Sequence, residues 1–333
     1  MDWKKKLRRF IYKHFGLIEL RYELMSFRTM LKYPPPLTNF KVVFLCNNVL
    51  AFGGLCDRLQ GMVSIYKVCK EEHLEYRIGH FYPFNLSDYF KPNKVDWTIA
   101  EDDVDLSTHN AMIIKSTMPS VKKTGMPWRE GAQIHESYLK YKLHHVGKRK
   151  RQVHMYTNAR LTTKEEFSDL FHELFSPSEE LQRLVEWNEE QIGSPYISIT
   201  TRFQNLLGDF YEGEQYGTLE KEEEKRNYIV KCLSKIEEIH LKHPDKKVLV
   251  TSDSSTFLKE AKNLPYVHVN PGKLAHIQYT NGDDDVYLKS FVDLLTIANA
   301  EKVYLLITGR MYRSGFAETA SFINKADYED VYF

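Results

Sequence analysis

The feature that most restricts the fold of this 333-residue sequence is a repeated order of short apolar runs, polar or glycine-containing turns, and amphipathic stretches. In the first half, the run 41–46 predicts a buried strand, and the loop 47–57 that follows it contains two adjacent glycines. Apolar residues then recur at helical spacing, at Leu59, Met62, Val63 and Tyr66. Further strands are expected at 75–80 and 111–115, and mostly helix from the 160s to 190. This order is typical of an α/β fold.

The second half repeats the pattern more clearly. Four apolar runs predict strands, at 196–202, 247–251, 266–270 and 302–308. Four further stretches predict helices, at 220–243, 256–263, 283–300 and 316–325. Strands and helices that alternate with short crossovers predict a parallel sheet covered on both faces, which binds ligands at the carboxyl ends of its strands.

The chain is long enough for two hydrophobic cores. We therefore expect two Rossmann-like domains that face each other across a cleft. The expected domains span 37–192 and 193–333, and the segment Gly193-Ser194-Pro195 is the expected hinge.

A basic N-terminal segment, residues 1–36, precedes these domains. Its first 33 residues contain nine Lys or Arg and three Asp or Glu, a net charge of +6. Drawn as a helix, the segment places Trp3, Leu7 and Phe10 on one face and most of its lysines away from that face. Two interpretations stay open: an interfacial helix on anionic lipid, or a solvated helix packed on the body of the protein.

Composition excludes several classes of protein. Apolar residues make up 42% and charged residues 27%, which indicates a globular chain. The net charge of +1 favours no nucleic acid, and the basic run 148–151 is either a solvated loop or a local contact for lipid or polymer. The four cysteines are too few and too irregularly spaced for a disulfide framework, which favours a reducing compartment, and the absence of a CxxC pair disfavours a zinc ribbon or a thioredoxin-type site. We find neither an 18-residue apolar run nor a signal peptide. We expect a soluble or peripheral intracellular protein.

Polar residues with a possible chemical role follow the strands of the second half. Arg202 ends the strand 196–202 and offers a planar fork of donors that suits a diphosphate, although an arginine there can also pair with an acidic neighbour. Asp253 ends the next strand, and Ser314 and Gly315 precede the last helix. Their alternative role is ordinary helix capping.

The first half contributes the segment 53–61, GGLCDRLQG. It is neither a GxGxxG fingerprint nor a P-loop. Gly53 and Gly54 permit a close backbone approach to a ligand, and Arg58 opens the following helix; a plain tight turn is the alternative.

Metal binding is not expected. The triplet Asp283–Asp285 and the pair Asp103 and Asp105 resemble DxD motifs, but acidic residues at a helix start are ordinary. No HExxH spacing and no GxSxG elbow occur, which disfavours a metalloprotease and a serine hydrolase.

Four stretches together resemble the fucosyltransferase superfamily, which includes the nodulation, core α1,6- and protein O-fucosyltransferases. They are 53–61, 197–202, 250–254, and Asp293 followed by Ser314-Gly315-Phe316 with Ala320. The sequence departs from the family where Thr200 and Thr201 stand close to the position of a frequent histidine.

The resemblance implies a GT-B fold, a GDP-fucose donor, inversion at the sugar and no metal. It implies that Arg202 binds the β-phosphate, that Asp253 contacts guanine or ribose, and that Asp293 contacts guanine. The expected donor-binding residues are Gly53, Gly54, Arg58, Arg202, Asp253, Ser254, Asp293, Ser314, Gly315 and Phe316.

The expected function is transfer of a sugar, with fucose as the leading candidate, from a GDP donor to a glycan or lipid-linked acceptor. The basic N-terminal helix would hold the enzyme at the cytoplasmic face of a membrane, in a bacterial surface-polysaccharide pathway. Asp209 and Asp57 are candidate general bases, with structural roles as the alternative. The competing hypotheses are a non-catalytic binding protein on a GT-B frame, and a transferase with another nucleotide donor, such as a sulfotransferase.

Overall fold

The computed structural model describes residues 3, 40–47, 53–107, 109–116, 125–145, 150–211, 217–274 and 284–333. Apart from Trp3, the expected N-terminal helix within 1–36 lies outside these residues, as do Asp283 and the first two residues of the basic run 148–151. Lys150, the described lysine of that run, is buried, and its ammonium donates a hydrogen bond to the His109 carbonyl (3.0 Å) inside the protein.

The chain forms two compact units. Unit 1 contains the described residues through Gly53, together with 57–82 and 92–174. Unit 2 contains 54–56, 83–91 and 175–333. The domain boundary indicated by the sequence, at 192/193, lies inside unit 2.

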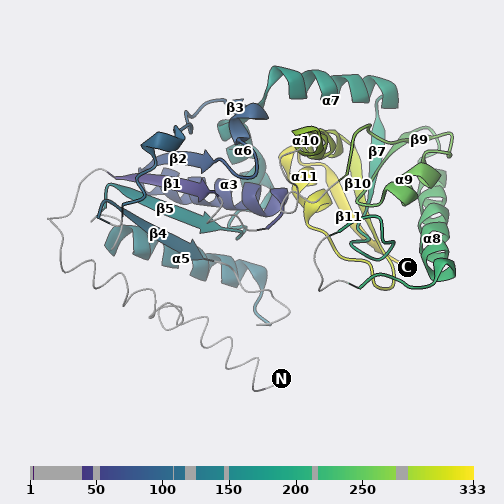
Figure 1. The fold of residues 1–333 in the computed structure, drawn as a ribbon, viewed down its shortest axis with the longest axis horizontal. Helices are drawn as coiled ribbons and strands as arrows, with labels where there is room; N and C mark the ends of the chain where they lie inside the picture. The colour runs from purple at the N-terminus through teal and green to yellow at the C-terminus, as the bar shows by residue number, and fades with distance from the viewer. Residues whose placement is uncertain are drawn as a thin grey trace. The chain divides into compact units, whose positions relative to one another are not determined.

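Unit 1 is built on a four-stranded parallel sheet of order β2-β1-β5-β4 (Figure 1). Its strands are β1 (Lys41–Cys46), β2 (Glu75–His80), β4 (Ala111–Ser116) and β5 (Gln152–Thr157). Its helices are α3 (Leu55–Glu71), α5 (Trp128–His145) and α6 (Lys164–Leu174), with a 3-10 turn at Glu101–Asp103.

The α3 helix forms where the sequence predicts it, and its four periodic apolar residues are all buried. Two elements of unit 1 were not predicted. The strand β5 lies between β1 and β4 but carries Gln152 and His154, which interrupt the apolar run that signals a buried strand. The helix α5 is rich in Lys, Tyr and His, which hides its apolar stripe.

Unit 2 is built on a five-stranded parallel sheet of order β11-β10-β7-β8-β9 (Figure 1). Its strands are β7 (Tyr196–Thr201), β8 (Lys247–Ser252), β9 (Val267–His268), β10 (Lys302–Ile307) and β11 (Asp327–Tyr332). Its helices are α7 (Glu179–Ile192), α8 (Glu222–Leu241), α9 (Ser255–Ala261), α10 (Asp284–Ala298) and α11 (Phe316–Ile323). A 3-10 turn (Leu86–Asp88) and the short strands β3 (Phe90–Pro92) and β6 (Phe175–Pro177) complete it.

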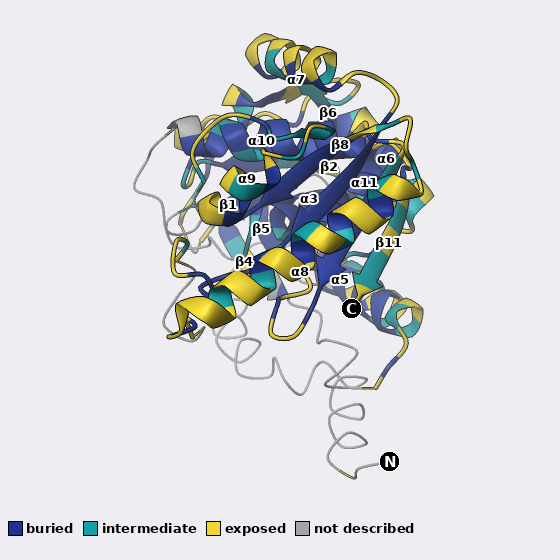
Figure 2. Cartoon of the chain, turned by 90° about the vertical axis from the view of Figure 1, so that its right-hand side faces the viewer, coloured by how far each residue is buried: buried dark blue, intermediate teal, exposed yellow. Residues whose placement is uncertain are grey.

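The central strands β7, β8 and β10 of unit 2 are almost entirely buried, and the helices around them are amphipathic (Figure 2). The helices α8 and α9 pack on the sheet through a core that includes Ile199, Val250 and Leu306, while α10 packs against α7 and α11. The charged edge strand β11 was not predicted, since DYEDVY contains no apolar run. Among the helices that the structure describes, none is both long and apolar enough to span a membrane.

Candidate functional site

The carboxyl end of the sheet in unit 2 gathers several of the predicted residues. Arg202 follows the last residue of β7, and its Nε lies 3.3 Å from Oδ2 of Asp253, which follows β8. The guanidinium carbon lies 4.9 Å from the centroid of the Phe210 ring. The backbone amide of Tyr312, in the loop after β10, donates to the Arg202 carbonyl (3.1 Å). Three strand ends therefore meet at Arg202.

Asp253 is almost completely buried, with its side chain 2% exposed. Its Oδ1 accepts from the amide of Phe203 (2.8 Å) and its Oδ2 from the amide of Gln204 (2.7 Å). Burial raises the pKa of Asp253, while Arg202 and the two amides act in the opposite direction. The carboxylate thus supports the turn after β7 in addition to pairing with the arginine.

Thr200 and Thr201, the last two residues of β7, form hydroxyl pairs with residues of β8. Thr200 and Thr251 share a hydrogen bond between their Oγ1 atoms (2.8 Å). Thr201 Oγ1 donates to Ser252 Oγ (2.8 Å), which in turn lies 3.5 Å from Oδ1 of Asp253. These hydroxyls join β7 to β8 directly below the site.

Ser254 and Asp209 form the start of α9. Ser254 is its N-cap, because its Oγ accepts from the amide of Phe257 (3.1 Å). Oδ2 of Asp209 accepts from Ser254 Oγ (2.8 Å) and from the amide of Thr256 (2.7 Å). Burial would raise the pKa of Asp209, but these hydrogen bonds outweigh it and hold the pKa below its ordinary value. The contacts are those of a helix cap, and the role of Asp209 as a general base stays a prediction.

Ser314, Gly315 and Phe316 form the start of α11. Ser314 Oγ accepts from the amide of Phe316 (3.2 Å), and Gly315 is the N-cap residue. A Cβ placed on Gly315 would meet no described atom within 4 Å, so the backbone here is not crowded by the described side chains. The amides at the start of a helix have the electrostatics of an anion-binding site.

Asp293 lies elsewhere, in the middle of α10. Both its oxygens lie 2.5 Å from Nζ of the buried Lys289, and Oδ1 also accepts from Nδ2 of Asn270 (2.8 Å). Asn270 donates as well to Thr296 Oγ1 (2.8 Å). The carboxylate is therefore engaged in a buried network, and its predicted contact with guanine is untested.

The glycine turn belongs for the most part to unit 1. Gly53 has φ +77, and a Cβ there would lie 2.7 Å from Oδ2 of Asp57, so the turn requires glycine. Arg58, fully buried, donates from Nε to the Gly53 carbonyl (3.2 Å) and from Nη1 to the Tyr82 carbonyl (2.9 Å), with His80 Nε2 at 3.0 Å. Its Nη2 has no hydrogen-bond partner among the described residues. These contacts are those of a tight turn that Arg58 stabilises by hydrogen bonding.

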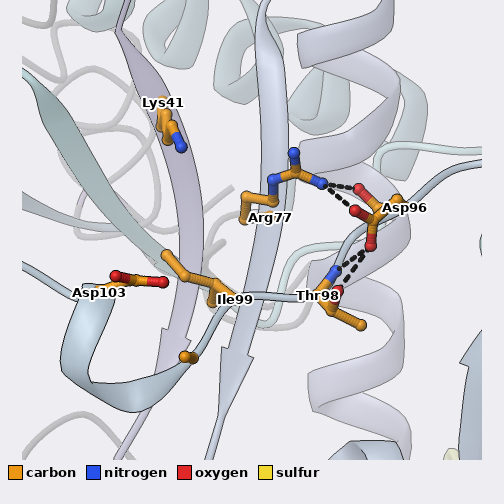
Figure 3. A pocket seen from close by; sticks show the side chains of 7 residues that line it. Lys41, Arg77, Asp96, Thr98, Ile99 and Asp103 are labelled. Carbon is orange, nitrogen blue, oxygen red and sulfur yellow. Dashed lines mark hydrogen bonds and ion pairs between the residues drawn. The ribbon is translucent and has the colours of Figure 1, made fainter.

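A cavity of about 560 Å³ lies in unit 1, near the start of β1 (Figure 3). Its lining includes Lys41, Asp103 and Arg77, and the guanidinium of Arg77 pairs with Asp96 (3.1 Å). Asp103 is the one DxD residue that lines it. Within the part of the chain that the structure describes, no group of three or more His, Cys, Asp or Glu residues is placed to hold a metal ion.

The two units with parallel sheets match a GT-B-like fold, and the solved structures to which this chain is similar include fucosyltransferases. The chain is similar to NodZ α1,6-fucosyltransferase soaked with GDP-fucose (TM-score 0.51, 15% identity, covering 86% of this chain and 93% of that one). It is also similar to a mutant of Arabidopsis thaliana FUT1 in complex with GDP (0.53, 12%, 100% and 80%). A third match is POFUT1 in complex with GDP (0.51, 12%, 90% and 99%).

No protein-family model and no curated protein matches the chain. The fold that the sequence motifs imply is thus confirmed by structures whose sequence identity with this chain is low. Sequence reasoning missed Phe210, Gln204 and Tyr312 as neighbours of Arg202. Their only signal was proximity in the chain to a strand end.

Proposed function

We propose that this chain is a glycosyltransferase that transfers fucose from GDP-fucose to a glycan acceptor. The observation that carries the proposal is Arg202, held at the carboxyl end of β7 by a buried carboxylate and tied through Tyr312 to the loop before α11. A second support is the fold, which this chain shares with fucosyltransferases determined with GDP or GDP-fucose.

In this reaction the leaving group is GDP, and negative charge develops on its β-phosphate. Arg202 would neutralise that charge with a planar fork of donors, and the amides at the start of α11 would add fixed dipoles. Fixed donors aimed at developing charge are a large source of catalysis and make a metal ion unnecessary in our proposal. The acceptor hydroxyl then attacks the oxocarbenium-like carbon from the opposite face, with inversion.

The attacking hydroxyl must lose a proton, and Asp209 and Asp57 are the candidate bases. Asp209 caps α9, and its lowered pKa makes it a weak base at neutral pH. A general base contributes roughly 100-fold or more to the rate. Replacing Asp209 with Asn therefore separates the two roles. If Asp209 is the base, the variant folds normally but turns over more slowly; if it is only a helix cap, the variant has a lower free energy of unfolding.

We further propose that the enzyme acts at an anionic membrane surface, with a lipid-linked glycan as its acceptor. The support is the net charge of +6 and the apolar face in the first 33 residues. Basic residues near an anionic surface contribute about 1 kcal/mol each, an attraction that salt weakens. A cytoplasmic location and a role in bacterial surface-polysaccharide synthesis belong to the same proposal.

The test is calorimetric titration of the full chain with GDP, using ADP and UDP as controls. We expect selective binding of GDP. Replacing Arg202 with Ala should weaken it about 10- to 100-fold, since a hydrogen bond to a charged group contributes roughly 1.5–3 kcal/mol. Arg183, exposed on α7, provides the matched Ala control. Failure to bind any of the three nucleotides would contradict the proposal.

Binding and turnover separate the remaining alternatives. GDP binding without hydrolysis or transfer from any GDP-sugar would favour the non-catalytic hypothesis. Binding of a 3′-phosphoadenosine nucleotide in place of GDP would favour the sulfotransferase-like alternative.

A further inference from the structure

We propose that Asp253 is a positioning residue, which together with Phe210 sets the direction of the Arg202 guanidinium and does not contact the nucleoside. The inference rests on the proposed function, because it assumes that Arg202 binds the diphosphate. It differs from the role that the resemblance implies for Asp253, which is a contact with guanine or ribose.

The first observation is the set of donors around the carboxylate. Three consecutive residues surround the carboxylate of Asp253: Arg202 forms an ion pair with it (Nε to Oδ2, 3.3 Å), and the amides of Phe203 (2.8 Å) and Gln204 (2.7 Å) donate hydrogen bonds to it. The carboxylate is almost fully buried, and a buried charge needs both a counter-charge and hydrogen bonds. Arg202 supplies the counter-charge and the two amides supply the hydrogen bonds, so both carboxylate oxygens contact groups of the protein itself.

The second observation is the backbone immediately after the arginine. Gln204 has φ +56, a left-handed conformation that is sterically unfavourable for a residue with a side chain. The hydrogen bond from its amide to Asp253 holds this conformation. The turn therefore leaves β7 in a defined direction directly behind Arg202.

The third observation concerns the plane of the guanidinium. Its Nε lies 3.3 Å from Oδ2 of Asp253, and the centroid of the Phe210 ring lies 4.9 Å from its central carbon. An ion pair at one edge and a ring on one face together restrict rotation of a planar group. Because a phosphate is bound by two parallel donors of the guanidinium, such restriction favours binding of the diphosphate.

The hydroxyls below the site orient the carboxylate in turn. Thr201 donates to Ser252 (2.8 Å), whose Oγ lies 3.5 Å from Oδ1 of Asp253 and also accepts from the amide of Ser254 (3.1 Å). Thr201, near the position of the family's histidine, thus affects the orientation of the Asp253 carboxylate, and through it the orientation of Arg202.

The experiment compares GDP with GMP, which lacks the β-phosphate, by calorimetric titration of the full chain. We expect Asp253→Asn and Phe210→Leu each to weaken GDP binding about tenfold, in the range of a single charge-assisted hydrogen bond, and to leave GMP binding within about twofold. Equal weakening of GDP and GMP by Asp253→Asn would overturn the proposal, because that is the result of a nucleoside contact.

Two controls exclude a general structural effect. Glu301→Gln removes a carboxylate that pairs with Lys246 at the other end of the sheet, and it should change neither affinity. In an Arg202→Ala background, Phe210→Leu should have no further effect on GDP binding, because Phe210 acts through the arginine; an additional loss would mean that the ring touches the ligand. If Asp253→Asn does not fold, Phe210→Leu carries the GDP and GMP comparison alone.

The Nε–H resonance of Arg202 in the ligand-free protein provides a readout that is independent of GDP. We expect it to be protected from exchange in the wild type and exposed in Asp253→Asn, with Arg202→Lys used for assignment. Protection that persists in Asp253→Asn would overturn the positioning role alone. A wild type that binds no GDP would overturn the proposed function, whatever the resonance shows.

Discussion

Gly61 lets a helix pack very close to a sheet, because its side chain is a single hydrogen atom. It lies in α3, and a Cβ built on it would lie 1.8 Å from the carbonyl oxygen of Thr157 at the end of β5. The obstructing atom belongs to the backbone of a central strand, so it cannot rotate away. The close contact of α3 with the sheet therefore depends on glycine at this position.

Replacing Gly61 with Ala should lower the free energy of unfolding by about 3 kcal/mol or more, at the upper end of the usual cost of overpacking. Urea denaturation of the two proteins measures it. Gly54→Ala is the matched control, since a Cβ there meets no described atom within 4 Å. Equal denaturation midpoints for Gly61→Ala and the wild type would contradict the packing argument.

His135, on α5, couples the stability of unit 1 to pH. It is fully buried, and burial lowers its pKa to about 4 from the ordinary value of 6.5. The unfolded chain therefore binds a proton more readily than the folded chain between these two values, and the free energy of unfolding falls as pH falls through that window. Above about pH 6.5 the histidine is neutral in both states and contributes no pH dependence.

We expect this residue to account for a loss of about 2 kcal/mol between pH 7 and pH 5. Denaturation of the wild type and of His135→Gln across this range measures the difference in slope. The glutamine variant should show the smaller loss on acidification. Parallel curves would mean that His135 is not the source of the dependence.

At the scale of elements, α10 is joined to β9 and its following loop by polar contacts. Asp293 pairs with Lys289 one turn away on the helix and accepts from Asn270, just beyond β9. Because both members of the ion pair are buried, each depends on the other for its compensation. These few contacts hold the helix in a fixed position against the sheet.

Asp293→Asn should lower the free energy of unfolding by about 3 kcal/mol, because it leaves a buried ammonium without its counter-charge. Replacing both residues, with Lys289→Met and Asp293→Leu, should recover much of the loss. The preference for GDP over ADP, measured on the same variants, tests the other expectation: a contact between Asp293 and guanine predicts that the preference falls even when stability is restored.

At the scale of the molecule, the predicted ligand site is distributed over the carboxyl ends of β7, β8 and β10 in unit 2. A ligand that binds the folded state stabilises it by about 2.7 kcal/mol at 100 times its dissociation constant. We expect GDP to slow hydrogen exchange in the segments 202–210 and 309–316 of the full chain, with UDP as control. Protection that is unchanged by Arg202→Ala would contradict the placement of the diphosphate at this edge.

Much of the order of elements was predictable because its signals are local. Apolar runs and helical periodicity depend only on neighbouring residues, and they located the strands β1, β2, β4, β7, β8, β9 and β10 and the helices α3, α8, α9, α10 and α11. The strands β5 and β11 and the helix α5 were missed for the same reason. Their partners, distant in sequence, make them strands or helices in spite of polar residues in their own pattern.

The sequence by itself determined the α/β class and the placement of Arg202 and Asp253 at strand ends, because the carboxyl ends of parallel strands share one edge. Tertiary structure alone decided which donors Asp253 receives, that Phe210 stacks on Arg202, and that Asp293 turns to Lys289 and Asn270. The physical reason is that strand register and loop path set the distant contacts. Asp253 meets donors 49 and 50 positions away and Asp293 meets Asn270 23 positions away, separations that no local pattern records.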